Sequence, residues 1–329
     1  MKQTLIFKSK PVITGYYSIG GPKESNGVIA KYLDKKLSTD TIDEKSFEKA
    51  ESKMIYMAIN GAIEKANKKD QEINAVIAGD LVNQIICSSF AVRNLKVPFL
   101  GIYNACATFA EGIAIGSTFL EANQMENIVC ASCSHFSTAE RQYRYPLELG
   151  STRPPLSQWT VTGAGALVIS KKGDGPRITS STIGKVIDFG ITDANNMGAA
   201  MAPAAADTIC AHFKEMDVSP NYYDLIITGD LGTFGSRILK DLVWEKGYDI
   251  ENQHVDCGEL VFNINEKEYQ GASGAGCSSM VFCSYLIDKL IRGKVKKVLL
   301  VCTGALLSSL SSQQGESIPS IAHAVSIEA

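Results

Sequence analysis

Short apolar runs and longer amphipathic segments alternate along the chain. Residues 73–78 and 223–228 are mostly apolar and each run stops at a turn, which is typical of buried strands. Before the first run, apolar side chains recur at helical spacing: Phe47, Ala50, Met54, Met57, Ala58 and Ala62. Strands that alternate with helices predict an α/β fold with mostly parallel sheets.

The same landmarks occur twice. Asp80 and Asp230 lie in identical Gly-Asp-Leu sequences directly after the two runs, 150 residues apart. Cys106 and Cys277 each follow small residues at the start of an apolar helical segment, 171 residues apart. At this second offset the predicted strand at residues 127–132 aligns with the predicted strand at residues 298–303. Three landmarks in one order indicate an internal duplication.

The two offsets differ by 21 residues, which places an insertion within the charged stretch 244–267. We therefore expect two similar halves, residues 1–175 and 176–329. The helices that begin at Cys106 and Cys277 are apolar on most sides, so they are expected to lie buried between two sheets. The predicted fold is a layered α/β/α/β/α arrangement made of two duplicated halves.

The composition argues against several classes of function. A formal net charge of -3, without a long run of either sign, gives no electrostatic footprint for nucleic acid or an anionic lipid surface. Nine cysteines without paired CxxC motifs indicate reduced thiols rather than a zinc site or a disulfide framework. The apolar runs are shorter than the ~18 residues of a membrane span, and no signal peptide is expected. If the protein works at a membrane, partners must hold it there.

Several segments resemble a known superfamily. Residues 101–108 run from a strand into Cys106 at the start of a buried helix, and this turn resembles the nucleophile turn of thiolases and ketoacyl synthases. Residues 162–168 are similar to the Gly-Ala-Gly strand start of ketoacyl synthase III-like members. Within the superfamily, four segments resemble the stage V sporulation protein AD family: 134–146, 190–193, 201–208 and 313–319.

That resemblance implies a thiolase-like fold, a homodimer, and a role in endospore formation. Members of the family are peripheral on the spore inner membrane, bind dipicolinic acid (pyridine-2,6-dicarboxylic acid), and help to move it into the developing spore. Other stage V sporulation membrane proteins are the implied partners. Whether calcium enters with the ligand stays open, and no other cofactor is expected.

The residues around Cys106 bear on catalysis. A thiol at a helix N-terminus can have a lowered pKa, as a nucleophile requires. Acyl transfer also needs His or Asn groups facing the thiol. The resemblance implies that these groups follow the strands before Asp230 and within 271–277, but no His or Asn occurs there. We therefore expect a catalytically disabled protein, with a ketoacyl synthase III-like acyltransferase that uses Cys106 as the alternative.

The pocket at Cys106 is the predicted ligand site. Helix N-termini and paired arginines suit carboxylates, and Met197, Met201 and Tyr145 suit the ring. The candidate ligand-binding residues are Cys106, His135, Arg141, Arg144, Met201, Asp230, Cys277 and Gln314.

Each candidate has a structural alternative. Cys106 can be a small buried hydrophobic residue, and Met201 can fill the core. Arg141 and Arg144 can form a surface pair or a subunit salt bridge. Asp230 can cap the turn after its strand, as we expect of Asp80 in the other half.

We expect the four histidines to lie in different environments. His135, at the end of a predicted central strand, is the best pocket candidate. His212 and His254 are expected on the surface. His323 lies in an alternating strand and can face either side of it.

Overall fold

The computed structural model describes residues 2–143, 153–262 and 270–329, and in them twelve strands form one continuous sheet. The ten strands on its main path divide into two sections of five, which we call the first and the second sheet. The first has the order β5-β4-β6-β8-β2, with bounds Phe99–Gly101, Ala75–Gly79, Asn127–Ser134, Gly163–Ser170 and Val12–Gly20. The second has the order β11-β10-β13-β14-β9, with bounds His254–Asp256, Leu225–Thr228, Lys297–Ala305, Ser320–Glu328 and Arg177–Thr182. Strand for strand, the second order repeats the first.

Strand directions match as well. β4 pairs in parallel with β5 and β6, and β8 pairs antiparallel with β6 and β2. Correspondingly, β10 is parallel to β11 and β13, and β14 is antiparallel to β13 and β9. The sheets join where Val12 of β2 pairs with Arg177 of β9. The predicted duplicated α/β fold is confirmed, whereas the exact boundary at residue 175 stays a prediction.

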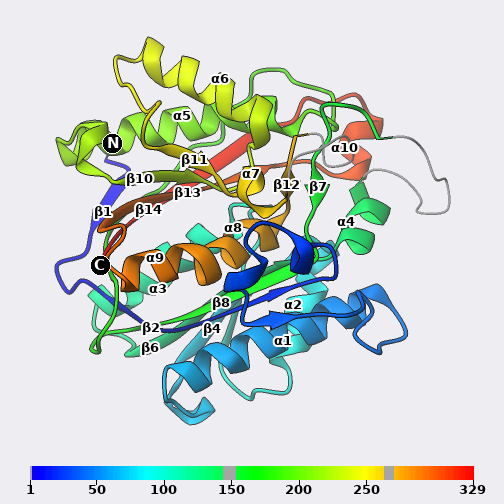
Figure 1. Cartoon of the computed structure of the whole chain (residues 1–329), viewed down its shortest axis with the longest axis vertical. Helices are drawn as coiled ribbons and strands as arrows, with labels where there is room; N and C mark the ends of the chain where they lie inside the picture. Colours follow the sequence, from blue (N-terminus) through cyan, green and yellow to red (C-terminus); the bar gives the residue numbers. More distant parts are fainter. Residues whose placement is uncertain (1, 144–152, 263–269) are drawn as a thin grey trace.

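Helices cover both sheets in five layers (Figure 1). α1 (Phe47–Lys65) and α2 (Ile86–Val92) cover the outer face of the first sheet, and α5 (Met197–Met216) and α6 (Gly232–Glu245) cover that of the second. Between the sheets lie α3 (Thr108–Glu121) and a second helix that starts as α8 (Ala275–Val281). The latter continues through a π-helical turn, Phe282–Leu286, into α9 (Ile287–Ile291).

Three apolar clusters fill the spaces between these layers. The central one joins α3 to α8 through side chains such as Phe109, Ile113 and Phe282. The other two lie under α1 and under α5. α3 is apolar on most sides because it contacts strands of both sheets, β4 and β6 of the first and β13 and β14 of the second, as the sequence predicted. α8 is buried against α3 and against β6 and β8 of the first sheet.

Shorter elements complete the chain. They are β1 (Thr4–Ile6), β3 (Lys35–Lys36), α4 (Phe136–Tyr143), β7 (Trp159–Thr160), α7 (Cys257–Val261), β12 (Ala272–Ser273) and α10 (Ser309–Gln313). Single 3-10 turns span Glu24–Asn26, Ala30–Tyr32, Asp70–Glu72, Asn83–Ile85 and Pro220–Tyr222. α7 and β12 lie between β11 and α8, and the shorter connection from β5 to α3 holds no matching helix or strand. These elements bring β7 and β12 together near the start of α8.

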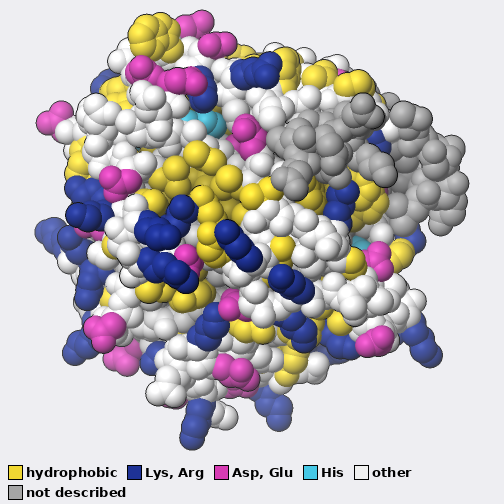
Figure 2. All heavy atoms as spheres, viewed as in Figure 1, with side chains coloured by type: hydrophobic (Ala, Val, Ile, Leu, Met, Phe, Trp, Pro, Cys, Tyr) yellow, Lys and Arg dark blue, Asp and Glu magenta, His cyan; other side chains and the backbone are white. Residues whose placement is uncertain are grey.

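One face of the molecule gathers basic side chains around α9 (Figure 2). Lys31, Lys65 and Arg292 surround a polar hollow there, together with Asp34 and Asp288. The net charge of the whole chain gives no hint of this local grouping. Within the described residues, no helix combines the length and apolar character needed to cross a membrane.

Candidate functional site

A tight turn places Cys106 at the mouth of the cleft between the two halves. Ala105 has a left-handed backbone with φ of 50°, so the chain reverses between the end of β5 and the start of α3. Thr108 fixes the turn, because its hydroxyl donates to the carbonyl of Ala105 (2.7 Å) and accepts the N–H of Asn104 (3.0 Å). Cys106 is 8% exposed and lines a pocket.

Asp230 lies beside the thiol in the second half. Its carboxylate accepts hydrogen bonds from the hydroxyls of Thr303 (2.7 Å) and Ser273 (2.8 Å) and from the N–H of Gly274 (3.1 Å). These donors come from β13 and from the start of α8. The helix N-terminus that was expected to receive a ligand carboxylate therefore already faces a carboxylate of the protein itself.

Burial and Asp230 set the state of the thiol. Burial raises the pKa of Cys106 well above its usual range, and the neighbouring Asp230 raises it further. The expected lowering of this pKa by the helix is therefore wrong. A thiol that stays protonated at neutral pH is a poor nucleophile.

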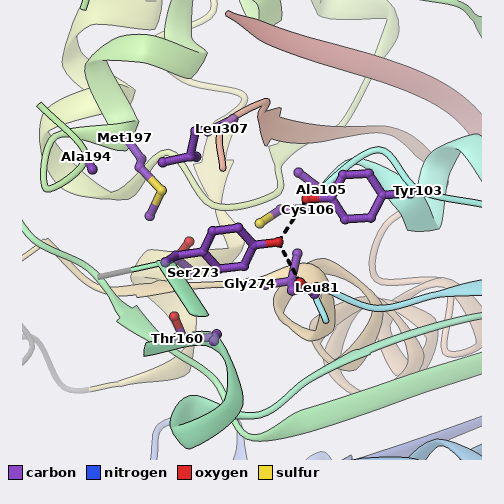
Figure 3. Close-up of a pocket in the computed structure, with 13 residues that line it drawn as sticks. Leu81, Tyr103, Ala105, Cys106, Thr160, Ala194, Met197, Ser273, Gly274 and Leu307 are labelled. Atoms are coloured by element: carbon purple, nitrogen blue, oxygen red, sulfur yellow. Dashed lines mark hydrogen bonds between the residues drawn. The ribbon is translucent and has the colours of Figure 1, made fainter. Parts of the chain in front are cut away.

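The pocket in front of Cys106 is mostly apolar (Figure 3). The lining residues come from both halves: Leu81, Tyr103, Ala105, Cys106, Ala139, Tyr143, Thr160, Ala194, Met197, Ser273, Gly274, Ala305 and Leu307. Such a lining suits an apolar group.

Two tyrosines provide most of the polar edge. The Tyr143 hydroxyl lies 3.0 Å from that of Tyr103 and donates to the carbonyl of Leu81 (2.5 Å), as the dashed lines in Figure 3 show. Burial raises the pKa of both phenols, so they remain neutral donors. Sequence reasoning did not select them, although Tyr103 lies inside the nucleophile turn and Tyr143 inside a segment that carried the family resemblance.

Of the seven predicted ligand residues that the structure describes, two lie at this pocket. Cys106 lines it and Asp230 lies directly behind Cys106. Asp230 does not cap its own turn, so that alternative is wrong. Arg144, like Tyr145, lies outside the described residues.

His135 faces away from the pocket, and the expectation that it lines the site is wrong. Its ring is buried, with Nε2 2.9 Å from the carbonyl of Asp40 and Nδ1 accepting the N–H of Ser137. Phe47 of α1 lies against the ring. Burial lowers the pKa of His135, so it is a neutral part of the core.

Arg141 lies on the solvent side of α4, also away from the pocket. It forms an ion pair with Glu48 of α1 at 3.6 Å, and its guanidinium lies over the ring of Phe47. The surface-pair alternative therefore describes this residue.

The remaining three candidates lie elsewhere. Met201 is fully buried in the core under α5, and Met197, one helical turn earlier, lines the pocket in its place. Cys277 is buried within α8 in the central cluster. Gln314 is exposed after α10, whereas Leu307 from the preceding loop reaches the pocket.

The prediction that His212 and His254 lie on the surface is also wrong. His212 is buried between the hydroxyls of Thr182 (2.7 Å) and Tyr223 (2.6 Å), and burial lowers its pKa to about 4. His254 is buried against Thr228, and burial lowers its pKa to about 3. His323 accepts the N–H of Gly184, and its other ring nitrogen faces the Asn104 amide. All four histidines are thus structural, and none lines the pocket.

Comparison with known proteins assigns the chain to a family. A family model described as stage V sporulation protein AD (SpoVAD) matches residues 1–328. The chain belongs to this family. Stage V sporulation protein AD of Bacillus subtilis (strain 168) is 42% identical over 327 residues, which cover 99% of this chain and 97% of that protein. The resemblance to the SpoVAD family inferred from the sequence is confirmed.

Solved structures confirm the thiolase-like fold. 3-oxoacyl-[acyl-carrier-protein] synthase III from Aquifex aeolicus VF5 matches with a TM-score of 0.59 and 15% identity, over 97% of this chain and all of that one. Cerulenin-bound OleA from Xanthomonas campestris matches with a TM-score of 0.63 and 14% identity, over 99% of this chain and 100% of that one. At these identities the likeness concerns the fold alone.

Proposed function

We propose that this SpoVAD-family protein acts in sporulation as a non-catalytic binding protein for dipicolinic acid and assists its uptake into the developing spore. The observation that carries the loss of catalysis is the pair Cys106 and Asp230. The position where acyl transfer requires a histidine holds a buried aspartate instead, and burial, together with this aspartate, keeps the thiol protonated. A pocket that keeps the position of the nucleophile without its proton acceptor is suited to binding.

The walls of the pocket support a flat aromatic ligand. Apolar side chains such as Met197 and Leu307 suit the ring. The hydrogen of the Tyr143 phenol is donated to Leu81, so Tyr103, whose hydroxyl can turn from Tyr143 to a ligand, is the neutral donor for a carboxylate. Among the described lining residues there is no Lys, Arg or His, and Asp230 lies behind Cys106. A dianion there needs accompanying positive charge, so we propose that calcium enters with dipicolinate.

Titration calorimetry tests this proposal. Dipicolinate is expected to give saturable heat, more strongly with calcium present, whereas benzoate, which has one carboxylate, is expected to bind at least tenfold more weakly. Absence of saturable heat in both conditions would contradict ligand binding. Equal affinity with and without calcium would contradict the role of the metal alone.

An acyltransferase is the second candidate. The tight turn at Ala105 presents Cys106 as a nucleophile turn does, which favours this function. Incubation with acetyl-CoA followed by intact mass measurement decides between the two. We expect no acetyl adduct, and a stable adduct on Cys106 would establish acyl transfer.

A homodimer through β5 is part of the proposal. Among the described residues β5 pairs with β4 alone, so it is an edge strand there. Leu100 in this strand (39% exposed) and Tyr103 just after it (46% exposed) present apolar surface. Phe90 of the neighbouring α2 is also half exposed. An open apolar edge strand is a template for pairing with a second copy across a two-fold axis.

Attachment to the spore inner membrane completes the proposal. We propose that other stage V sporulation membrane proteins recruit the chain, and the charged face around α9, where Lys65 pairs with Asp34 and Arg292 with Asp288, offers a polar surface for this contact. Flotation of the protein with spore inner membranes, with and without the other stage V proteins, tests this. Equal flotation without those partners would contradict recruitment by them.

A further inference from the structure

Two buried carboxyl groups lie together beneath the walls of the Cys106 pocket. Glu51 of α1 is fully buried, and so is Asp80 at the end of β4. One carboxylate oxygen of each, together with the Sγ of Cys87, lie within 4.8 Å of one another. Within the described residues no Lys, Arg or His is paired with Glu51. Two carboxylates in such a place repel one another strongly, so their proton count matters.

Asp80 is the ionised member of the pair. It accepts the N–H groups of Val82 (2.9 Å) and Ser88 (2.7 Å) and the hydroxyl of Ser88 (2.6 Å). Three donors aimed at one carboxyl group stabilise its negative charge. Asp80 thereby caps the turn after its strand, as the sequence predicted.

Glu51 is the member of the pair that carries the proton, because its donors are weaker than those of Asp80. The Thr138 hydroxyl donates its one hydrogen to Oε2 of Glu51 (2.7 Å), the shorter of its two contacts. The carbonyl of His135, 3.0 Å from the same hydroxyl, already accepts the N–H of Ala139. The second oxygen of Glu51 accepts from the Cys133 thiol (3.5 Å).

The surroundings agree with a neutral Glu51. Burial raises its pKa to about 8, and Asp80 adds to the rise. Burial also raises the pKa of the Cys87 and Cys133 thiols, which face Glu51 from α2 and β6, so both are neutral. Glu48 of α1 and Arg141 of α4 form an ion pair with each other at the protein surface.

We propose that Glu51 and Asp80 carry one proton between them at neutral pH, held on Glu51, and that this state lets two walls of the pocket pack together. Glu51 accepts from Thr138 on α4, the helix that carries Ala139 and Tyr143 into the pocket. Asp80 holds the turn that carries Leu81, whose carbonyl accepts from Tyr143. Loss of the proton places a second negative charge within 4.8 Å of Asp80, while Thr138 still donates to Glu51 and keeps α4 with it. α4 and the turn then separate, so the pocket loosens as pH rises.

The sign of the effect on stability follows from linkage. The folded protein binds a proton at Glu51 up to a pH of about 8, whereas the unfolded chain releases it near its ordinary value of 4.5. Stability therefore falls as pH rises between these two values and is independent of this group above them. Glu51→Gln, which keeps a neutral donor and acceptor, removes this slope.

Hydrogen exchange of the free protein tests the proposal without reference to any ligand. Wild type and Glu51→Gln are compared at the same pH, first near pH 6.5 and then near pH 9.5, on the peptides that cover α4 and 81–85. Equal protection near pH 6.5 and at least threefold faster exchange of wild type near pH 9.5 are expected. Glu48→Gln on the same helix is the matched control and should behave as wild type at both pH values.

Infrared titration of the wild-type protein covers the case in which Glu51→Gln does not fold. The carbonyl band of a protonated carboxylic acid is expected to persist at pH 7 and to disappear around pH 8. Thr138→Val, which removes a donor to the Glu51 carboxylate, should raise the pH at which it disappears, and Thr138→Ser should leave it in place. No protonated band at pH 7, or equal exchange of the two proteins near pH 9.5, would overturn the proposal.

Discussion

The two Gly-Asp-Leu turns have the same sequence and the same place in the two sheets, yet their aspartates act differently. Asp80 caps its own turn and holds Ser88. Asp230 instead reaches across to Thr303, Ser273 and the side of Cys106. A repeated sequence therefore does not ensure a repeated role, because the neighbouring strand decides where each carboxylate can point.

Asp256 explains the difference. It ends β11 and accepts the N–H groups of Leu231 and Gly232, so it caps the second turn and frees Asp230 for the pocket. Thr228 of β10 lies opposite Asp256 of the neighbouring strand β11. In the first half, the equivalent pair is Ala78 of β4 opposite Gly101 of β5. Since Gly101 has no carboxylate, Asp80 must cap the turn itself.

The largest expected effect concerns this cap. Asp256→Ala leaves three buried N–H groups, of Leu231, Gly232 and Gly258, and the Thr228 hydroxyl without their acceptor. We expect a loss of about 3 to 5 kcal/mol in the free energy of unfolding, measured by urea denaturation. Asp80→Ala should cost less, about 1 to 2 kcal/mol, because its removal also relieves the repulsion with Glu51. Equal losses would contradict the proposed difference between the turns.

The edge strands β5 and β11 extend the comparison to assembly. β5 leaves apolar side chains exposed, whereas His254 and Asp256 of β11 are buried. Leu100→Lys places like charges together at the proposed two-fold axis and is expected to weaken the dimer by about 2 kcal/mol, roughly thirtyfold. Analytical ultracentrifugation measures this change.

Trp244→Lys is the control for the dimer. Trp244 is more exposed than Leu100 but lies on α6, far from β5 along the layers, so this change should leave the dissociation constant unaltered. A wild-type protein that sediments as a monomer would contradict assembly through β5.

The smallest effect is expected at Arg141. Its ion pair with Glu48 lies at the surface, so Arg141→Met should change stability by less than about 0.5 kcal/mol. Since Arg141 lies away from the pocket, dipicolinate affinity measured by calorimetry should also stay within twofold of wild type. A tenfold loss would place Arg141 in the site, as the sequence alone suggested.

The fold was largely predictable because it depends on periodicities that the sequence repeats. The offsets of 150 and 171 residues indicated that the two halves repeat the same order of strands and helices. The direction in which each side chain points was harder to predict, since it depends on contacts between residues far apart in the sequence. The rotation of α4 turns Arg141 to solvent, and a single turn of α5 separates Met197 from Met201.

Buried polar networks were the least predictable feature. His212 lies in a segment with Lys214 and Glu215, which suggested a surface position, but Thr182 and Tyr223 supply partners that make its burial tolerable. Asp256 lies in the charged insertion, where nothing in the local sequence indicates that it caps a turn 25 residues earlier.

The most direct test of the account is the pH dependence of Cys106 modification by a thiol reagent, followed by peptide mapping. Because Asp230 and burial keep the thiol protonated, we expect little modification of wild type at neutral pH. In Asp230→Asn the same modification is expected to become at least tenfold faster at that pH. A wild-type Cys106 that reacts rapidly at neutral pH, unaffected by Asp230→Asn, would contradict the claim that the second half silences the nucleophile.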